Sequence, residues 1–112
     1  MPHPFQTPPR LYTSIDARPD FQGNINDYLA RNLRYPARAK KKGREGTATV
    51  RFIVGQDGCT SDAAVVRSTG VPSLDSEAVR LVRAMPPWKP GLHDNQPVKV
   101  YWTLPITFKL ED

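Results

Sequence analysis

The sequence contains one cysteine, Cys59, and two histidines, His3 and His93. A single cysteine cannot close an intrachain disulfide or supply a thiolate cluster, so stability must come from burial of apolar side chains. The two histidines are far apart in the sequence, and neither has a partner at metal-ligand spacing. No glycine-rich phosphate loop precedes any expected helix. We therefore predict no metal site and no cofactor.

Long apolar runs are also absent. No segment approaches the roughly 20 apolar residues that cross a bilayer, and the first residues lack the apolar stretch of a secretory signal. At 112 residues and 38% hydrophobic content, we expect a soluble chain with one modest core. Four of the twelve prolines lie in residues 1–9, which is typical of an extended tether. We therefore predict a proline-rich tether or linker end over residues 1–18 and one domain over residues 19–112.

Acidic residues are fewer than basic ones: 11 acidic and 16 basic residues give a net charge of +5. Much of the excess lies in residues 38–44, where five of seven side chains are basic. No aromatic residues interleave this run to stack bases, so we predict no nucleic-acid partner. A solvated helix face is one interpretation of the run. Binding of an anionic polymer such as peptidoglycan is the alternative, and it would depend steeply on salt.

Two short helices are expected at the start of the domain. Asn24 can cap a helix over residues 25–33, whose apolar residues repeat at helical spacing. Pro36 fits the first position of a second helix, because its missing N–H has no helical partner there anyway. Ala37 and Ala39 are expected to pack inward from this second helix.

A hairpin and a third helix follow. Residues 47–54 alternate apolar and polar side chains, which predicts a half-buried strand, and turn residues connect it to a weaker β run through Val66. Ser73 is then expected to cap a helix that ends before Pro86. The expected buried stripe of this helix is Leu74, Ala78, Leu81, Val82 and Met85.

The last segment carries the most regular pattern. Every even-numbered residue from Val98 to Leu110 is apolar, and the alternation continues through Pro105. We therefore expect one strand of thirteen residues with a single register. Proline cannot donate a ladder hydrogen bond and is confined to edges, strand starts or bulges. The strand is thus predicted at the edge of its sheet.

An edge of this length is predicted to keep free hydrogen-bonding groups. At about 3.4 Å per residue it would span roughly 44 Å, so the strand over residues 47–54 could pair only part of it. Such an edge suits β-augmentation, in which a partner peptide adds a strand. Two alternatives stay open on these residues: Pro105 and Lys109 only guard an ordinary sheet edge, or two copies pair as a homodimer.

Several short motifs recur in a characteristic order. They are Tyr35-Pro36 with Ala39, Gly46 before an alternating strand, Asp57-Gly58, Leu74-Asp75 with Glu77-Ala78 and Arg80, Met85-Pro86 with Trp88-Lys89-Pro90-Gly91, and Pro105-Ile106 with Phe108 and Leu110. Taken together, over residues 19–110, their order and spacing resemble the TonB C-terminal domain family, in particular the variety common in Bacteroidetes. One departure is Asn95, which stands where the family commonly has a glycine.

The resemblance implies an α+β fold. The expected fold is a three-stranded antiparallel sheet with its first strand central, its last strand at the edge, and two to three helices on one face. The implied function is that of a periplasmic, receptor-binding domain in an inner-membrane-anchored energy transducer. The transducer would couple the proton motive force to TonB-dependent outer-membrane transporters through their TonB box. A proton-channel complex of the ExbB/ExbD type would be a second partner, contacted through a segment preceding this domain.

The resemblance also implies a peptide-binding surface made of two segments, the end of the last strand and the residues around the Tyr-Pro motif. Its expected residues are Asn32, Arg34, Tyr35, Pro36, Ile106, Thr107, Phe108, Lys109 and Leu110. The tyrosine and proline of the motif are expected only to position their segment.

Two other functions are alternatives for this sequence. An enzyme is disfavoured, because Cys59 follows a turn glycine without a neighbouring base, and Asp75 and Glu77 suit the helix dipole better than an acid and base pair. We therefore predict no catalytic residues. The alternative within the same fold is a TonB-like sensor or interaction domain of a membrane-anchored regulatory peptidase, or a TolA-like protein. What precedes residue 1 in the gene product would discriminate these from a transducer.

Overall fold

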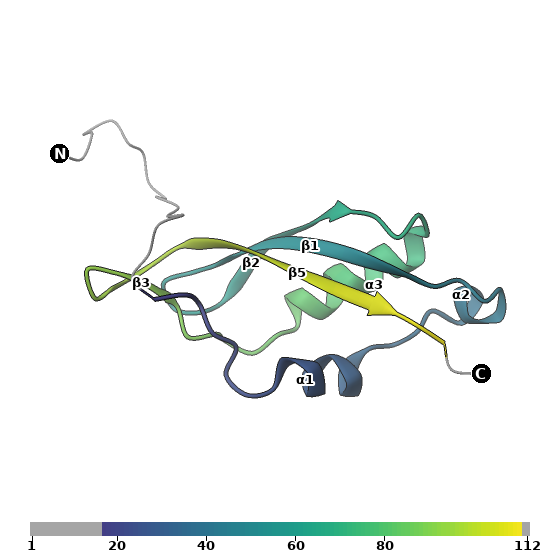
Figure 1. Ribbon diagram of the computed structural model, residues 1–112, viewed down its shortest axis with the longest axis horizontal. Helices are drawn as coiled ribbons and strands as arrows, with labels where there is room; N and C mark the ends of the chain where they lie inside the picture. The colour runs from purple at the N-terminus through teal and green to yellow at the C-terminus, as the bar shows by residue number, and fades with distance from the viewer. Residues whose placement is uncertain (1–16, 111–112) are drawn as a thin grey trace.

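The structure is a computed structural model that describes residues 17–110, in which helices and strands combine in one α+β fold (Figure 1). The helices are α1 (Ile25–Asn32), α2 (Ala37–Lys41) and α3 (Pro72–Arg83). The strands are β1 (Gly46–Val54), β2 (Thr60–Arg67), β3 (Gly91–His93), β4 (Gln96–Val98) and β5 (Val100–Phe108). The predicted fold class is confirmed, with one small hairpin that was not expected.

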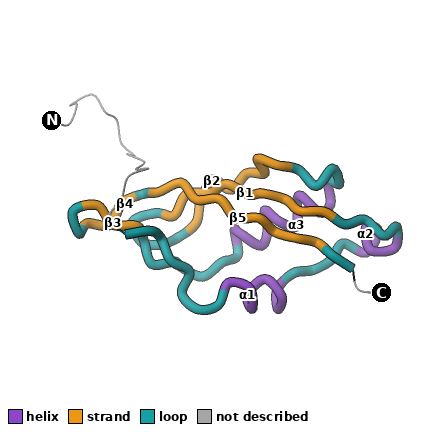
Figure 2. Tube along the Cα trace, in the orientation of Figure 1, coloured by secondary structure: helices purple, strands orange, loops and turns teal. Residues whose placement is uncertain are grey.

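The main sheet is antiparallel, with strand order β2-β1-β5 (Figure 2). β1 is central, and β5 lies at one edge, as predicted. β3 and β4 form a separate two-stranded sheet. Ala17, at the start of the described residues, forms a bridge with Leu92, and Asp20 forms one with Lys89. Residues 1–16 of the predicted tether lie outside the described residues.

The core lies between the main sheet and the helices. From β1, Val50, Phe52 and Val54 are fully buried, and they belong to the same cluster as Ile106 and Phe108 of β5. The predicted stripe is buried against them: Leu74, Ala78, Leu81 and Val82 lie in α3, and Met85 follows just after the helix ends. Each large apolar side chain of this kind contributes about 1.5–3 kcal/mol by leaving water. This burial fixes which face of β5 is turned inward.

Both N-terminal helices form, with differences in detail. The Asn24 side chain accepts a hydrogen bond from the Asp27 N–H at 3.1 Å, which confirms the predicted cap. Pro36 is the N-cap of α2 rather than its first helical residue. Ala39 is buried but Ala37 is exposed, so the expectation for Ala37 was wrong. A helix of five residues turns only one narrow face to the core.

The start of α3 differs from the prediction. Ser73 does not cap the helix, because Val71 is the N-cap and Pro72 is the first helical residue. Proline at this position is pre-organised for a helix and loses no hydrogen bond. Asp75, in the first turn, accepts hydrogen bonds from the N–H of Thr69 at 2.9 Å and from its hydroxyl at 2.7 Å. The incoming loop is therefore held by Asp75 rather than by Ser73.

The prediction of a final strand of thirteen residues was also wrong. Residues 96–98 belong to β4, which pairs with β3 through a tight turn, and β5 covers only nine residues. The turn is made by Asp94 and Asn95, with φ of 52° and 61°. Asn and Asp adopt this left-handed conformation more easily than other side chains. Asn95 thus substitutes for the glycine common at this position in the family.

The turn between β1 and β2 is fixed to the segment that follows α3. The Trp88 N–H donates to the Gly58 carbonyl at 2.8 Å. Gly58 has φ of +85°, and a Cβ added there would lie 1.9 Å from the Trp88 carbonyl oxygen. Only glycine can meet both conditions, because a side chain would be strained and would clash with backbone.

Candidate functional site

The β5 edge is the first part of the candidate site. β1 pairs with β5 along its whole length, from Gly46 opposite Phe108 to Val54 opposite Val100. The expectation that β1 would leave part of the strand unpaired was therefore wrong, because β5 is shorter and β1 longer than predicted. On its other side, no strand within residues 17–110 pairs with β5. The available edge is that second side of the strand.

The direction of the backbone groups along this edge follows from two observations. The hydroxyl oxygens of Thr47 and Thr107, which are directly opposite, lie 3.1 Å apart. Close side chains are typical of antiparallel pairs that exchange no backbone hydrogen bonds. Pro105 has the same parity as Thr107 and has no N–H to donate to β1. Both observations indicate that the backbone groups of the odd-numbered residues of β5 point away from β1.

The end of the predicted binding segment leaves the sheet. Lys109 and Leu110 follow β5 and are not part of a strand. The Leu110 N–H donates to a Glu45 carboxylate oxygen at 2.5 Å. The Leu110 N–H therefore already has a partner within the chain. Lys109, the residue before it, is exposed. Residues 111 and 112 lie outside the described part of the chain.

The segment before α2 is the second part of the site, and side chains of α3 hold it. The Arg34 N–H donates to a Glu77 carboxylate oxygen at 2.7 Å. The Arg80 guanidinium donates to both Glu77 oxygens at 2.7 Å and to the Asn32 carbonyl at 2.9 Å. Asn32 also closes its own helix, since its side-chain amide donates to the Tyr28 carbonyl at 2.8 Å. The ion pair between Glu77 and Arg80 thus holds the backbone of residues 32–34 against α3.

The two parts of the site meet at Tyr35. Its ring contacts the ring of Phe108 edge-on, with centroids 5.8 Å apart. Its hydroxyl donates to the Arg44 carbonyl. Burial raises the pKa of this hydroxyl, and the nearby Glu45 carboxylate raises it further. A raised pKa favours the protonated hydroxyl, which is the form that donates.

The side chains of the nine predicted residues divide into three groups by their exposure. Ile106 and Phe108 are buried at 1% exposure and face the core. Asn32, Arg34, Thr107 and Lys109 are exposed, and Tyr35, Pro36 and Leu110 are partly buried. A partner strand would therefore meet the outward backbone groups of Thr107 together with exposed polar side chains.

Glu77 is a residue that sequence reasoning assigned only to the helix dipole. It is 8% exposed, and it pairs with Arg80 one turn later. Burial alone would raise its pKa, but hydrogen bonds from Arg80 and from the Arg34 N–H outweigh burial and lower it. Its spacing from Leu74 and Leu81 was the available signal, because residues three and four apart share a helix face.

Groups capable of other chemistry are few. The Asp57 carboxylate accepts a hydrogen bond from the Cys59 N–H at 2.9 Å, and its hydrogen bond to the thiol and its charge raise the thiol pKa. A raised pKa disfavours the thiolate, which is the nucleophilic form. Within residues 17–110, no three His, Cys, Asp or Glu side chains cluster in a way that could hold a metal ion.

None of the helices in the described part of the chain has the length and apolar character needed to cross a membrane.

Comparison with known proteins gives a consistent result. A family model for the C-terminal region of the Gram-negative bacterial TonB protein matches residues 31–110. A TonB protein of Haemophilus influenzae is 32% identical over 87 residues, covering 75% of this chain and 32% of that protein. One of Pseudomonas putida is 26% identical over 106 residues, covering 92% of this chain and 43% of that protein. The chain thus spans less than half the length of these relatives.

Solved structures agree in fold. The solution structure of a Helicobacter pylori TonB C-terminal domain superposes with a TM-score of 0.61 at 25% identity, covering 79% of this chain and 91% of that domain. The Pseudomonas aeruginosa TonB C-terminal domain superposes with a TM-score of 0.57 at 21% identity, covering 92% and 95%. The second match bears on the fold alone.

Proposed function

Because the chain belongs to the TonB C-terminal domain family, we propose that it is the receptor-binding domain of a TonB-type energy transducer. Proteins of this family are energy transducers and not enzymes, in keeping with the expectation that the chain has no catalytic residues. The full protein would couple the inner-membrane proton motive force to TonB-dependent outer-membrane transporters. The domain itself would lie in the periplasm, and a preceding segment would anchor it and contact the proton-channel complex.

The mechanism we propose is strand addition of the receptor's TonB box to β5. The observation that carries it is the β5 edge, along which no strand of the described chain pairs. Proteins normally cover or shorten such edges, and a peptide that adds a strand gains main-chain hydrogen bonds from the edge. The outward backbone groups of Thr107 would provide these bonds beyond the proline, and Lys109, which follows β5, would join the pairing as the peptide extends the strand.

The segment before α2 would contact the same peptide. Tyr35 connects this segment to Phe108, and Glu77 and Arg80 fix its backbone. The exposed Asn32 and Arg34 side chains would then face polar or acidic groups of the peptide. Tyr35 and Pro36 would act as positioning residues, because their contacts are internal.

The test is a titration of isotope-labelled chain with synthetic N-terminal peptides of candidate receptors, followed amide by amide. Perturbations and slowed amide exchange are expected at Thr107 and Lys109 and in residues 32–35. A scrambled peptide of equal composition is the control. Perturbations confined to β2, or unchanged exchange at Thr107 under saturating peptide, would contradict strand addition at β5.

A further inference from the structure

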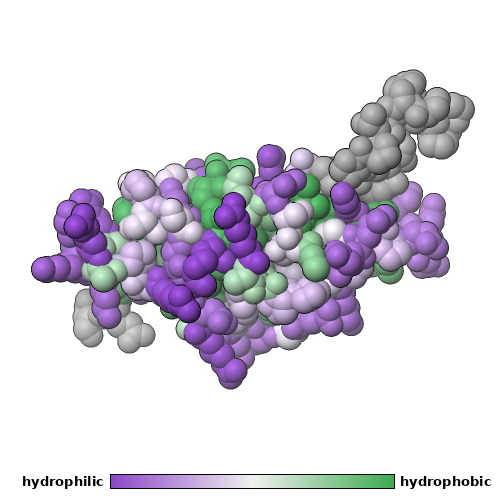
Figure 3. Space-filling view, turned by 180° about the vertical axis from the view of Figure 1, so that it is seen from behind, coloured by the Kyte–Doolittle hydropathy of each residue, from purple (hydrophilic) through white to green (hydrophobic). Residues whose placement is uncertain are grey.

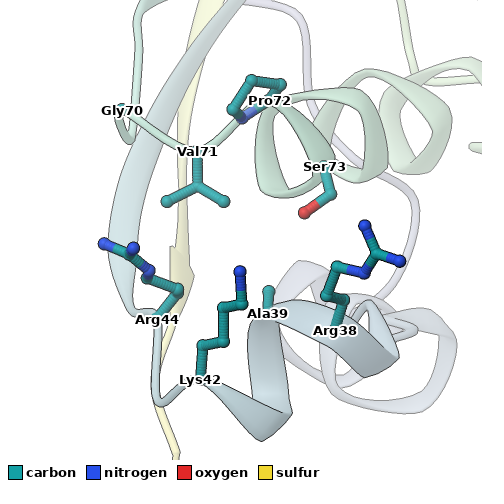
Figure 4. Close-up of a pocket in the computed structure, with 8 residues that line it drawn as sticks. All are labelled: Arg38, Ala39, Lys42, Arg44, Gly70, Val71, Pro72 and Ser73. Carbon is teal, nitrogen blue, oxygen red and sulfur yellow. The ribbon is translucent and has the colours of Figure 1, made fainter.

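A second surface of the molecule has the character of a binding site and is separate from the β5 edge. It is a pocket of about 270 Å³ between α2, the loop leading into β1, and the start of α3. We call it the α2–α3 pocket, and Figure 4 shows its lining. The side chains that matter are those of Arg38, Ala39, Lys42, Arg44, Val71 and Ser73.

Three cations, Arg38, Lys42 and Arg44, line this pocket. Within residues 17–110, no carboxylate lies within salt-bridge distance of Arg38, Lys42 or Arg44. The Lys42 ammonium is directed into the space bordered by Val71 and Ser73, and the Arg38 guanidinium lies on the Ser73 side (Figure 4). The view from behind shows hydrophilic side chains gathered at the end of the molecule that carries α2 (Figure 3). Unpaired charges of one sign around a concave surface concentrate the local potential.

The acidic side chains nearest in sequence are engaged elsewhere. Asp75, in the first turn of α3, bonds with Thr69 and lines a different pocket. Glu45, next to Arg44, accepts the Leu110 N–H. Within residues 17–110, no carboxylate therefore neutralises the positive charge of the pocket.

The remaining lining adds donors that suit an oxyanion. The pocket lies at the N-terminus of α3, a helix of twelve residues whose dipole is positive at this end. The Ser73 hydroxyl lines it as a further hydrogen-bond donor. Guanidinium groups match phosphate oxygens in geometry, and lysine adds a point charge. Its volume, below the roughly 300–1,000 Å³ of typical small-molecule sites, suits a single small group.

From these observations we propose that the α2–α3 pocket binds a phosphate group. Free phosphate and the phosphate of a lipid headgroup present the same oxygens to the three cations. Strand addition at β5 is not needed for this binding, so the test uses the whole chain without any receptor peptide.

The first arm of the test is a titration with inorganic phosphate at constant ionic strength, with chloride as the replaced ion. Saturable amide shifts are expected at Gly70, Val71 and Ser73. The lining variant Arg38→Gln/Lys42→Gln should weaken phosphate binding by at least about tenfold, because one lost charged hydrogen bond alone is worth about that factor. The matched variant Lys40→Gln/Lys41→Gln removes equal charge from residues outside the pocket, and it should change the affinity less than about twofold.

Three results would overturn the proposal. The first is a linear, unsaturable shift identical to that with chloride. The second is equal weakening by the two double variants, which would show a diffuse charge effect. The third is equally tight saturation by acetate, which would make the site a carboxylate site.

The second arm identifies the source of the phosphate. Vesicles of phosphatidylglycerol in phosphatidylcholine are compared with pure phosphatidylcholine vesicles in a sedimentation assay. Binding to the anionic vesicles that inorganic phosphate competes away, and that the lining variant alone loses, assigns the pocket to a lipid headgroup. Saturation by inorganic phosphate without vesicle binding assigns it to a soluble phosphate, and both results support the site.

Discussion

The ring of Tyr35 packs edge-on against the ring of Phe108, with their planes inclined at 89°. This contact joins the segment before α2 to the last strand, although the two residues are far apart in sequence. Because the Tyr35 hydroxyl is also bonded to the Arg44 carbonyl, the residue connects three segments. The proposed peptide-binding surface depends on this connection.

Truncation of Tyr35 should separate the two parts of the surface. Tyr35→Ala is expected to weaken receptor-peptide binding and to speed amide exchange in residues 34–36, because an aromatic pair contributes about 0.5–1.5 kcal/mol beyond its buried area. Tyr35→Phe keeps the ring and loses only the hydroxyl, so it should bind peptide nearly as the parent does. Isothermal titration with one peptide compares them. Equal affinity of all three would show that the contact is not needed.

Removal of one outward donor tests the edge directly. Thr107→Pro should weaken peptide affinity about three- to tenfold, since a net hydrogen bond is worth about 0.5–1.5 kcal/mol. Thr107→Val keeps the N–H and removes only the hydroxyl next to Thr47, so its affinity should stay within about twofold. Circular dichroism establishes that both variants are folded. An unchanged affinity in folded Thr107→Pro would contradict an outward role for this donor.

Glu77 should be important for stability. In Glu77→Gln, Arg80 loses its charged partner and one of three acceptor contacts is lost, so we expect destabilisation by about 1–3 kcal/mol. Faster amide exchange at Arg34 should accompany it. Asp62→Asn, at an exposed β2 position, removes equal charge and should cost less than about 0.5 kcal/mol. Urea unfolding measures both, and equal midpoints would show that the Glu77 contacts are energetically neutral.

Two carboxylates that are at least partly buried, Glu77 and Asp75, should make stability depend on pH. Burial would raise the pKa of both Glu77 and Asp75, but their hydrogen bonds outweigh it and lower the pKa from ordinary values of 4.5 and 3.8. A folded-state pKa below the unfolded one adds stability that is complete above the unfolded pKa and is lost as pH falls through the folded pKa. Stability should therefore be constant from neutral pH to about 5 and fall at lower pH. Unfolding curves recorded between pH 7 and 3 measure this loss, which should be smaller in Glu77→Gln; a loss as large as in the parent would assign it to other groups.

Alanine substitutions at two glycines should distinguish the cost of backbone strain from the cost of a steric clash. Gly43 has φ of +67° with nothing within 4 Å of an added Cβ, so Gly43→Ala should cost only about 1–2 kcal/mol of left-handed strain. Gly58→Ala adds the clash with the Trp88 carbonyl, and it should cost about 2–5 kcal/mol. Chemical denaturation of the two variants gives the difference. Similar costs would show that the Trp88 segment moves away without penalty.

The sequence predicted most of the fold because its signals were local. Alternation in residues 47–54 and in the final segment identified the inward faces of β1 and β5, and Pro105 identified the edge. The length of the last strand was wrong because the turn at Asp94 and Asn95 directs the chain into β4, and two left-handed non-glycine residues carry a weak signal. The start of α3 was misplaced because Ser73 and Pro72 are both common at helix N-termini. In the structure the helix begins at Pro72, and hydrogen bonds from Thr69 to Asp75 hold the loop before it.

The part of the site that was not predicted depends on contacts between residues far apart in the sequence. Glu77 and the Arg34 N–H are 43 residues apart, and no spacing rule brings them together. The α2–α3 pocket is similar, because its cations come from residues 38–44 and its other wall from residues 70–73. The basic run is evident in the sequence. Which of its residues line the α2–α3 pocket depends on how the start of α3 is placed relative to α2. Lys42 lines the pocket, whereas Lys40 and Lys41 do not.

Pro105 has a consequence for how a visiting peptide would be aligned. It lies in the middle of β5, opposite Thr49, and it interrupts the outward row of N–H donors at one known point. A peptide carbonyl placed opposite the proline ring would lose its partner, so sliding the peptide by two residues along the edge would carry a penalty. Pro105 would thereby give the complex one preferred alignment, and it would disfavour the sliding, self-pairing contacts through which a uniform edge aggregates.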